Sequence, residues 1–190
     1  MDKFENLESL RKMIMAVIYG LAVGDALGVP VEFEARDSYS LTEMIGYGTY
    51  HQPIGTWSDD TSLTLALMEH LGEKSDLSIL MDKFVAYRDG YLTPFGYCFD
   101  IGIATNEAIE RYLSGISPEA CGGKDERSNG NGALMRISPL VFLLIKMSNL
   151  IDQVKVIKKY TTVTHGHPRS IVASIIYIFL LKDMLFNNSL

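Results

Sequence analysis

The sequence predicts an all-α protein, folded as a compact multi-helix bundle. Apolar residues recur every three or four positions along most of its 190 residues, which is the period of one face of an α-helix. Glycine-rich segments at 46–55, 89–102 and 121–132 separate these stretches, and no pair of alternating apolar segments flanks a hairpin turn. We therefore expect one domain over residues 1–190, without an internal repeat or a linker.

The helices are expected in the following order. The first has an apolar face from Leu10 to Leu21. The second runs from Leu63 to Leu71 and ends at Gly72, because glycine often follows the last turn of a helix. Further helices fit residues 77–88, 101–113, 133–146, 150–160 and 168–185.

Two apolar runs, 13–23 and 171–181, raise the question of a membrane. The first lacks the basic start and the small-residue cleavage site of a signal peptide. The second is too short for a helix to cross about 30 Å of hydrocarbon. We interpret both as buried core helices and expect no membrane contact. Arg169 is the only strongly charged residue between 161 and 181, so the last helix is apolar nearly all round, with nothing C-terminal to cover it.

The composition argues against a general nucleic-acid surface. The formal net charge is −6, whereas such a surface needs clustered lysine and arginine. Cys98 and Cys121 show neither metal-site spacing nor the pattern of a disulfide framework. A reduced, cytoplasmic setting is the simplest expectation.

The segment Ser58-Asp59-Asp60-Thr61 has two interpretations. Hydroxyl and carboxylate side chains at a helix start accept hydrogen bonds from free backbone N–H groups, and acids favour that end of the helix dipole. One acid is enough for a cap, and two carboxylates beside hydroxyls also supply the oxygen ligands that a hard divalent cation needs. The pattern alone favours capping, and both interpretations stay open.

Other segments carry candidate residues with similarly open interpretations. Glu32 follows the helix-ending Gly28-Val29-Pro30 and is, in isolation, an ordinary surface acid. The glycine-spaced loop before residue 133 is either an anion-binding turn or a flexible capped turn, and it matches neither the P-loop nor the dinucleotide-binding fingerprint. His165 and His167 lack a third zinc ligand, which favours a capping or substrate-facing role. Capping alone also explains Asp100 at an expected helix start.

Taken together, five segments resemble the ADP-ribosylglycohydrolase family, also called ADP-ribosyl-acceptor hydrolases. They are GLAVGDALGVPVEF, GTWSDDTSL, CFDIG, GNGALMRISPL and the dipeptide Thr164-His165, which follow the family's order and cover most of the chain. One segment alone is weak, but the ordered set is specific. The CFDIG segment most resembles the bacterial branch that includes the dinitrogenase reductase-activating glycohydrolases.

The resemblance implies an all-α fold of that family's type, with two magnesium ions, or manganese, in a cleft. It implies metal ligation by Ser58, Asp59 and Asp60. It also implies a catalytic Glu32 beside the metals and a catalytic Asp100 that meets the guanidinium of a modified arginine. The substrate-binding residues that it implies are Ser128, Gly130, Asn131, Gly132, His165 and Gly102, with the loop 128–132 on the ADP-ribose diphosphate.

We accordingly expect a metal-dependent hydrolase that removes ADP-ribose from modified protein side chains, through the N-glycosidic linkage to arginine. Two alternatives stay open: a catalytically impaired ADP-ribose-binding fragment, and a hydrolase of another ADP-ribose-linked small molecule. The family's second metal motif, Asp-x-Asp-Thr, is absent from this sequence, so we expect the N-terminal portion of a family member. The expected partners are ADP-ribose or an ADP-ribosylated protein. Self-association through the last helix is a further expectation.

Overall fold

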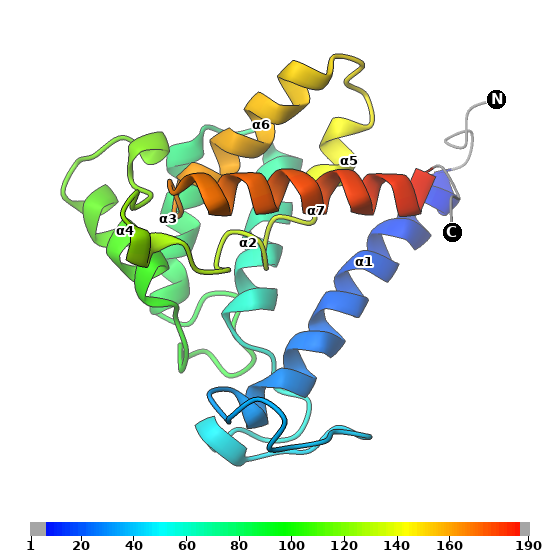
Figure 1. The fold of residues 1–190 in the computed structure, drawn as a ribbon, viewed down its shortest axis with the longest axis vertical. Coiled ribbons are helices and arrows are strands. Elements are labelled where there is room, and N and C mark those ends of the chain that lie inside the picture. The colour runs from blue at the N-terminus through cyan, green and yellow to red at the C-terminus, as the bar shows by residue number, and fades with distance from the viewer. Residues whose placement is uncertain (1–6, 187–190) are drawn as a thin grey trace.

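The computed structural model describes residues 7–186, which fold as helices and connecting loops (Figure 1). The α-helices are α1 (Leu7–Gly28), α2 (Asp59–Glu73), α3 (Leu77–Arg88), α4 (Ile103–Leu113), α5 (Leu140–Leu144), α6 (Leu150–Thr162) and α7 (Pro168–Phe186). Single-turn 3-10 helices are η1 (Val29–Val31), η2 (Gly48–Tyr50), η3 (Pro118–Ala120) and η4 (Glu126–Ser128). Within residues 7–186 no β-strand forms, and the β-type pairings are the isolated bridges Tyr47–Gln52 and Gly123–His165. The predicted all-α class is confirmed.

Most helix boundaries follow the sequence prediction closely. The expected helix 77–88 is α3, and α4, α6 and α7 match the ranges 101–113, 150–160 and 168–185 to within two residues. The helix expected over 133–146 is wrong, because residues 132–136 form turns and α5 begins only at Leu140. Pro139 has no N–H to donate and disfavours helical backbone at Ser138, so one helix does not continue through this point.

The core lies between α2, α3, α4 and α6. Helix α2 packs against α1 and α3, and α3 packs in turn against α4. Fully buried side chains of one cluster come from all four core helices: Leu63 and Leu67, Phe84, Ile109, and Ile157. This packing positions the N-terminal ends of α2 and α4, where the candidate site lies.

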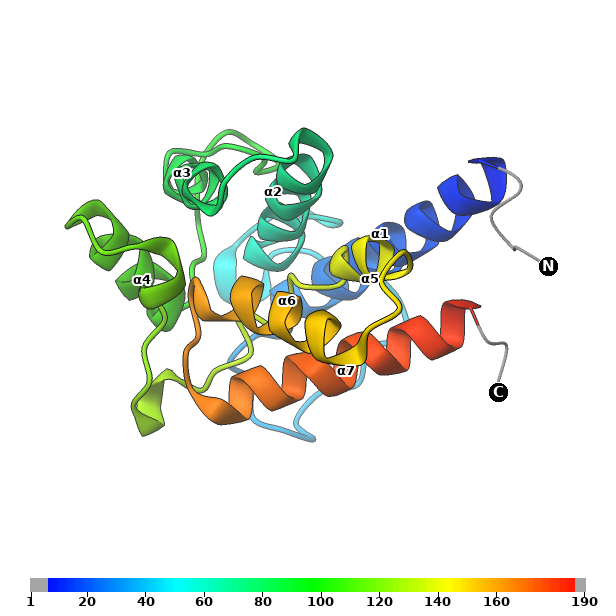
Figure 2. The same cartoon turned by 90° about the horizontal axis from the view of Figure 1, so that it is seen from above.

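Helix α7 lies along α6 and buries only one face (Figure 2). Ser170, Ser174 and Ile178 are buried, whereas Ile176 and Leu180 are 63% and 57% exposed. The interpretation of 171–181 as a buried core helix is therefore wrong. Its main packing partners, α5 and α6, cover one side, and the opposite apolar face stays open within the described part of the chain.

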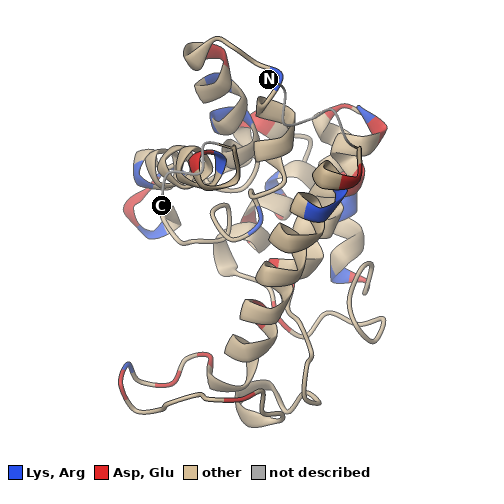
Figure 3. Ribbon diagram, turned by 90° about the vertical axis from the view of Figure 1, so that its right-hand side faces the viewer, with Lys and Arg blue, Asp and Glu red and all other residues tan. Residues whose placement is uncertain are grey.

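Helix α1 is apolar and exposed as well. Of its residues 7–28, Ala26 alone is buried. Residues 13–24 carry no charged side chain, and Figure 3 shows most of this long helix as uncharged ribbon. The interpretation of 13–23 as a buried core helix is wrong, because α1 packs chiefly against α2 and η1.

Length and composition single out this same helix for a possible membrane span. Leu7–Val31 is the one helix among residues 7–186 that is long and apolar enough to cross a membrane. Core helices of soluble proteins and signal sequences pass the same test, so the expectation of no membrane contact stays a prediction.

Candidate functional site

The acidic start of α2 is capped from another helix. Ser58 occupies the N-cap position, and its side chain makes no capping hydrogen bond. Instead, the carboxylate of Asp25 on α1 accepts hydrogen bonds from the backbone N–H groups of Ser58 and Thr61, at 2.9 and 3.0 Å. It also accepts from both of their hydroxyl groups, each at 2.7 Å. Since Asp25 caps the helix, the capping interpretation does not account for Asp59 and Asp60.

Asp25 is a site residue that sequence reasoning missed. It lies within the segment GLAVGDALG, which the apolar periodicity marks as helix. Its hydrogen-bond partners lie 33 and 36 residues further along the chain, so no local pattern reveals the contact. One feature of the sequence could have pointed to Asp25: it is a single acid that directly follows an uncharged helical run from residue 13 to residue 24.

Asp59 and Asp60 line a cavity of about 340 Å³ beside the starts of α2 and α4. Asp59 is 4% exposed, and its Oδ2 accepts a hydrogen bond from the Gly102 N–H at 3.1 Å, which joins the two helix starts. The predicted site residues that line this cavity are Glu32, Asp59, Asp60, Asp100, Gly102, Gly130, Asn131, Gly132 and His165. Ser58 lies outside this lining, in a second cavity of about 400 Å³ that Asp25, Glu32 and Asp60 also line.

Burial and the repulsion of nearby carboxylates raise the pKa values of Glu32, Asp59 and Asp60. Burial raises the pKa of Glu32 to about 7, and the negative charges of Asp100 and Asp60 add to the effect. Burial also raises the pKa of Asp59, with repulsion from Asp100 and Asp60. It raises the pKa of Asp60 together with repulsion from Asp25. The charged neighbours acting on these groups are all carboxylates, so a bound cation would relieve the repulsion.

Asp100 does not cap the helix that follows it. The N-cap residue of α4 is Gly102. The backbone carbonyl of Asp100 accepts a hydrogen bond from the Tyr87 hydroxyl at 2.6 Å. Burial raises the pKa of the Asp100 carboxyl group, and hydrogen bonding to Tyr50 opposes this shift. Hydrogen bonding to Tyr50 opposes the rise in the pKa of Glu32 as well, and sequence reasoning missed Tyr50 because the short helix η2 carries no motif.

The donor chemistry of the site suits a hard divalent cation. Ser58, Asp59 and Asp60 offer hydroxyl and carboxylate oxygens, the ligands that magnesium and manganese prefer. Within residues 7–186, however, no three His, Cys, Asp or Glu side chains lie close enough together to form a metal site. These residues therefore fit part of a coordination sphere, and the two-metal expectation stays a prediction.

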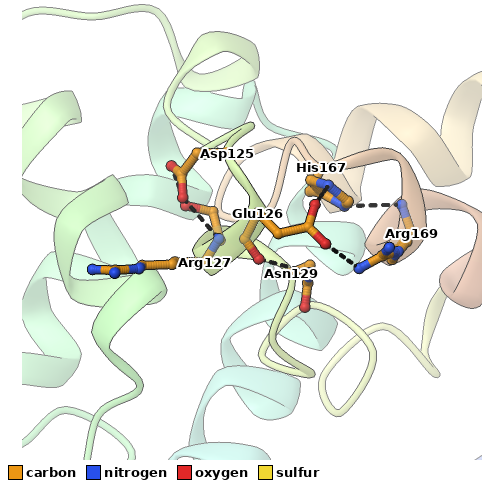
Figure 4. A network of polar contacts seen from close by, with 7 residues as sticks. Asp125, Glu126, Arg127, Asn129, His167 and Arg169 are labelled. Carbon is orange, nitrogen blue, oxygen red and sulfur yellow. Dashed lines mark hydrogen bonds and ion pairs between the residues drawn. The ribbon is translucent and has the colours of Figure 1, made fainter.

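Side chains on both sides hold the glycine-spaced loop in place. Asp125 accepts a hydrogen bond from the Ser128 hydroxyl at 2.8 Å. Glu126 forms an ion pair with Arg169, at the start of α7, at 2.5 Å, and its Oε2 lies 3.5 Å from His167 Nε2 (Figure 4). Ser128 is buried and does not line the 340 Å³ cavity. Its contact with a diphosphate stays a prediction.

Two glycines of this loop lie close to His165. A Cβ at Gly132 would lie 2.8 Å from His165 Cε1, whereas a Cβ at Gly130 would lie 3.8 Å from His165 Nε2. Gly132 is therefore needed for close packing, and Gly130 leaves ordinary contact distance. His167 plays a different part, because its Nδ1 accepts a hydrogen bond from the Arg169 N–H at 3.2 Å at the start of α7. The sequence predicted a capping or a substrate-facing role for His167, and the structure shows capping.

The family model for ADP-ribosylglycohydrolase matches residues 6–189. The chain belongs to the ADP-ribosylglycohydrolase family. The family resemblance of the sequence is thereby confirmed.

Named relatives agree with this assignment. The chain is 33% identical over 185 residues to "ADP-ribosylarginine hydrolase Tri1" of Serratia proteamaculans (strain 568), covering 96% of this chain and 49% of the relative. It is 30% identical over 169 residues to "ADP-ribosyl-[dinitrogen reductase] glycohydrolase" of Rhodospirillum rubrum, covering 85% and 54%. A solved "ADP-ribosylglycohydrolase-related protein complex" matches with a TM-score of 0.74 at 33% identity, covering 94% and 58%. The chain spans about half the length of the curated relatives that it matches.

Further residues of this ADP-ribosylglycohydrolase chain line the same cavity and carry no sequence signal. Phe33 is 81% exposed, so it lies on the rim. Thr105 of α4 is fully buried, and its hydroxyl has no partner among the described residues. Arg127, in the glycine-spaced loop, adds a positive charge to a lining that is otherwise acidic.

Proposed function

We propose that this ADP-ribosylglycohydrolase chain takes part in hydrolysing the N-glycosidic bond between ADP-ribose and arginine. The observation that carries the proposal is a single cavity lined by the acids of α2 and by the glycine-spaced loop. Such a cavity suits a ligand with a sugar at one end and a diphosphate at the other. The Serratia relative is named an ADP-ribosylarginine hydrolase, which supports arginine as the linkage.

The acids divide into two roles in this proposal. Ser58, Asp59 and Asp60 would hold a magnesium or manganese ion, which when bound supplies positive charge to orient the ribose hydroxyls and polarise water. Glu32, whose pKa burial raises, lies beside these acids and stabilises the positive charge that develops on the ribose as the C–N bond breaks. Asp100 accepts N–H bonds from the leaving guanidine, as carboxylates do in bidentate pairs with arginine.

In this proposal the glycine-spaced loop, which lines the same cavity, binds the diphosphate. Gly130 and Gly132 allow a ligand to approach the backbone N–H groups of the loop, and successive N–H groups of this kind bind anions. Arg127, which also lines the cavity, contributes positive charge.

Release of ADP-ribose tests the proposal directly. The purified 190-residue chain is incubated with an arginine-ADP-ribosylated peptide, first with magnesium and then with EDTA. We expect release that EDTA abolishes and that Asp59→Asn lowers by at least about 100-fold. Asp76→Asn is the matched control, because Asp76 precedes α3, is exposed and makes no capping hydrogen bond. Undiminished release by Asp59→Asn would refute the proposal.

A second function, ADP-ribose binding without turnover, is favoured by one observation. The described acids do not form a complete metal site. Calorimetric titration with ADP-ribose, alongside the release assay, separates the two functions. Binding without release supports the second, and no binding to a folded chain contradicts both. Serine-linked and O-acetyl-linked ADP-ribose test which linkage is cleaved. Replacement of Asp100 should lower hydrolysis of the arginine-linked substrate more than hydrolysis of the other two, because only arginine presents a guanidinium to this carboxylate.

A further inference from the structure

A fully buried arginine lies behind the cavity wall that contains His165. Arg136 is 0% exposed, and its Nε has no partner among the described residues. Its guanidinium lies 5.0 Å from the centre of the Phe84 ring and donates weakly to the Tyr160 carbonyl, at 3.4 Å. Its short contact is from Nη2 to Thr164 Oγ1, at 2.5 Å. A buried guanidinium with these partners is costly, so its position needs an explanation.

The hydrogen bonds continue from Thr164 to His165. Thr164 Oγ1 lies 2.9 Å from Nδ1 of the His165 ring. A guanidinium has donors and no acceptor, so Arg136 must donate to the Thr164 hydroxyl. Among the described contacts of this hydroxyl, His165 Nδ1 is the one group that can accept its proton, so Nδ1 acts as the acceptor and the hydroxyl proton is not left without a partner. A neutral imidazole that accepts at Nδ1 carries its proton on Nε2.

The Nε2 edge of His165 is the edge next to the loop. A Cβ at Gly132 would lie 3.2 Å from Nε2, and a Cβ at Gly130 would lie 3.8 Å from it. His165 and both glycines line the 340 Å³ cavity. A proton on Nε2 is therefore placed to meet an oxygen of a ligand that lies against this loop.

We propose that Arg136 and Thr164 are positioning residues that fix His165 as a neutral hydrogen-bond donor, with its proton on Nε2, toward an anionic oxygen in the cavity. The ligand in this inference, the diphosphate of ADP-ribose, rests on the proposed function, whereas the tautomer does not. Burial and the charge of Arg136 lower the pKa of His165 to about 4, which agrees with a neutral ring. Burial lowers the pKa of Arg136 to about 9, so the guanidinium stays protonated at neutral pH and keeps its donor role.

The ring nitrogens of His165 report the tautomer by NMR of the ¹⁵N-labelled chain. Two-bond couplings between ring carbon-bound protons and the two nitrogens distinguish an Nε2-protonated ring from an Nδ1-protonated one. We expect the wild-type ring to be neutral and protonated at Nε2. Thr164→Val removes the relay while keeping the side-chain shape, and should give a mixture of tautomers. Thr164→Ser restores the hydroxyl and should restore the wild-type pattern.

Affinity for ADP-ribose is the second readout. We expect Thr164→Val to weaken binding about tenfold, the cost of one hydrogen bond, and Thr164→Ser to recover it. Thr162→Val is the matched control, because the Thr162 hydroxyl bonds to the Lys159 carbonyl within α6 and is outside the relay. Thr162→Val should change neither readout.

The two readouts separate the possible failures. A wild-type ring protonated at Nδ1, or a Thr164→Val chain with the wild-type tautomer, overturns the relay. If the tautomers are as expected but Thr164→Val binds ADP-ribose with unchanged affinity, the relay has no role in binding. If the wild-type chain does not bind ADP-ribose, the proposed ligand fails, and the tautomer spectra still decide the relay. If Thr164→Val does not fold, Thr164→Ala removes the same hydroxyl with a smaller side chain, and its tautomer decides the relay.

Discussion

The carboxylate of Asp25 holds the start of α2, and its removal should destabilise the fold measurably. In Asp25→Asn, removal of a negative charge from the positive end of the helix dipole costs about 0.3 to 1 kcal/mol. An amide has one acceptor oxygen in place of two, so a hydroxyl bond from Ser58 or Thr61 is also lost, at about 0.5 to 1.5 kcal/mol. Together these give about 0.8 to 2.5 kcal/mol. For a chain of this length, that corresponds to a fall in Tm of roughly 2 to 10 °C.

Urea unfolding followed by circular dichroism measures this change in the free energy of unfolding. Asp76→Asn is the control, because Asp76 stands at the N-cap of α3 without a side-chain capping bond and should cost less than about 0.5 kcal/mol. If Asp25→Asn is no more destabilising than Asp76→Asn, Asp25 does not hold α2 and the reasoning is refuted.

Three other predictions follow from the site and from α7. The pKa of Glu32 is raised to about 7 by burial, so the folded chain keeps a proton that the unfolded chain releases. The urea concentration at the unfolding midpoint should therefore decrease as the pH rises from about 4 to about 8, and magnesium should make this decrease smaller. A midpoint concentration that increases over this range would contradict the prediction. Gly132→Ala should destabilise the fold by about 1 to 3 kcal/mol, because the added Cβ would lie 2.8 Å from His165 Cε1. Gly130→Ala should stay within about 0.5 kcal/mol, and equal urea midpoints for the two variants would count against the packing argument. Replacement of the exposed Ile176 and Leu180 by Glu should lower any self-association measured by sedimentation velocity, and association that persists in the variant would exclude this face.

Helix positions could be predicted from the sequence where periodicity and a nearby stop signal agreed. Helix α3 has both, because its apolar residues recur with helical period and Asp89-Gly90 follows it. The range 133–146 shows the limit of this reasoning. Apolar spacing across it favoured a helix, although Pro139 was visible and does prevent one from continuing.

The cavity residues divide in the same way. Asp59, Asp60 and the glycines of the 130–132 loop belong to short motifs, so their order along the chain was enough to predict them. Asp25 acts through partners more than 30 residues away, and periodicity reports only which residues share a face of one helix. Burial of α1 and α7 could not be predicted either, because it depends on which elements pack against them.

Because Asp25 of α1 caps the start of α2, the geometry of the site also depends on the packing of α1 against α2. Asp59 and Asp60 keep their positions only while α1 lies against α2, so a peptide that carries residues 55–73 alone would have a frayed first turn and present its acids in no fixed arrangement. The dependence acts in both directions, because linkage is reciprocal. Any ligand that binds these acids in their folded arrangement also makes the separation of α1 from α2 less favourable. Hydrogen exchange at the N–H groups of Ser58 and Thr61 should therefore slow when such a ligand is added, even though Asp25 itself need not touch it.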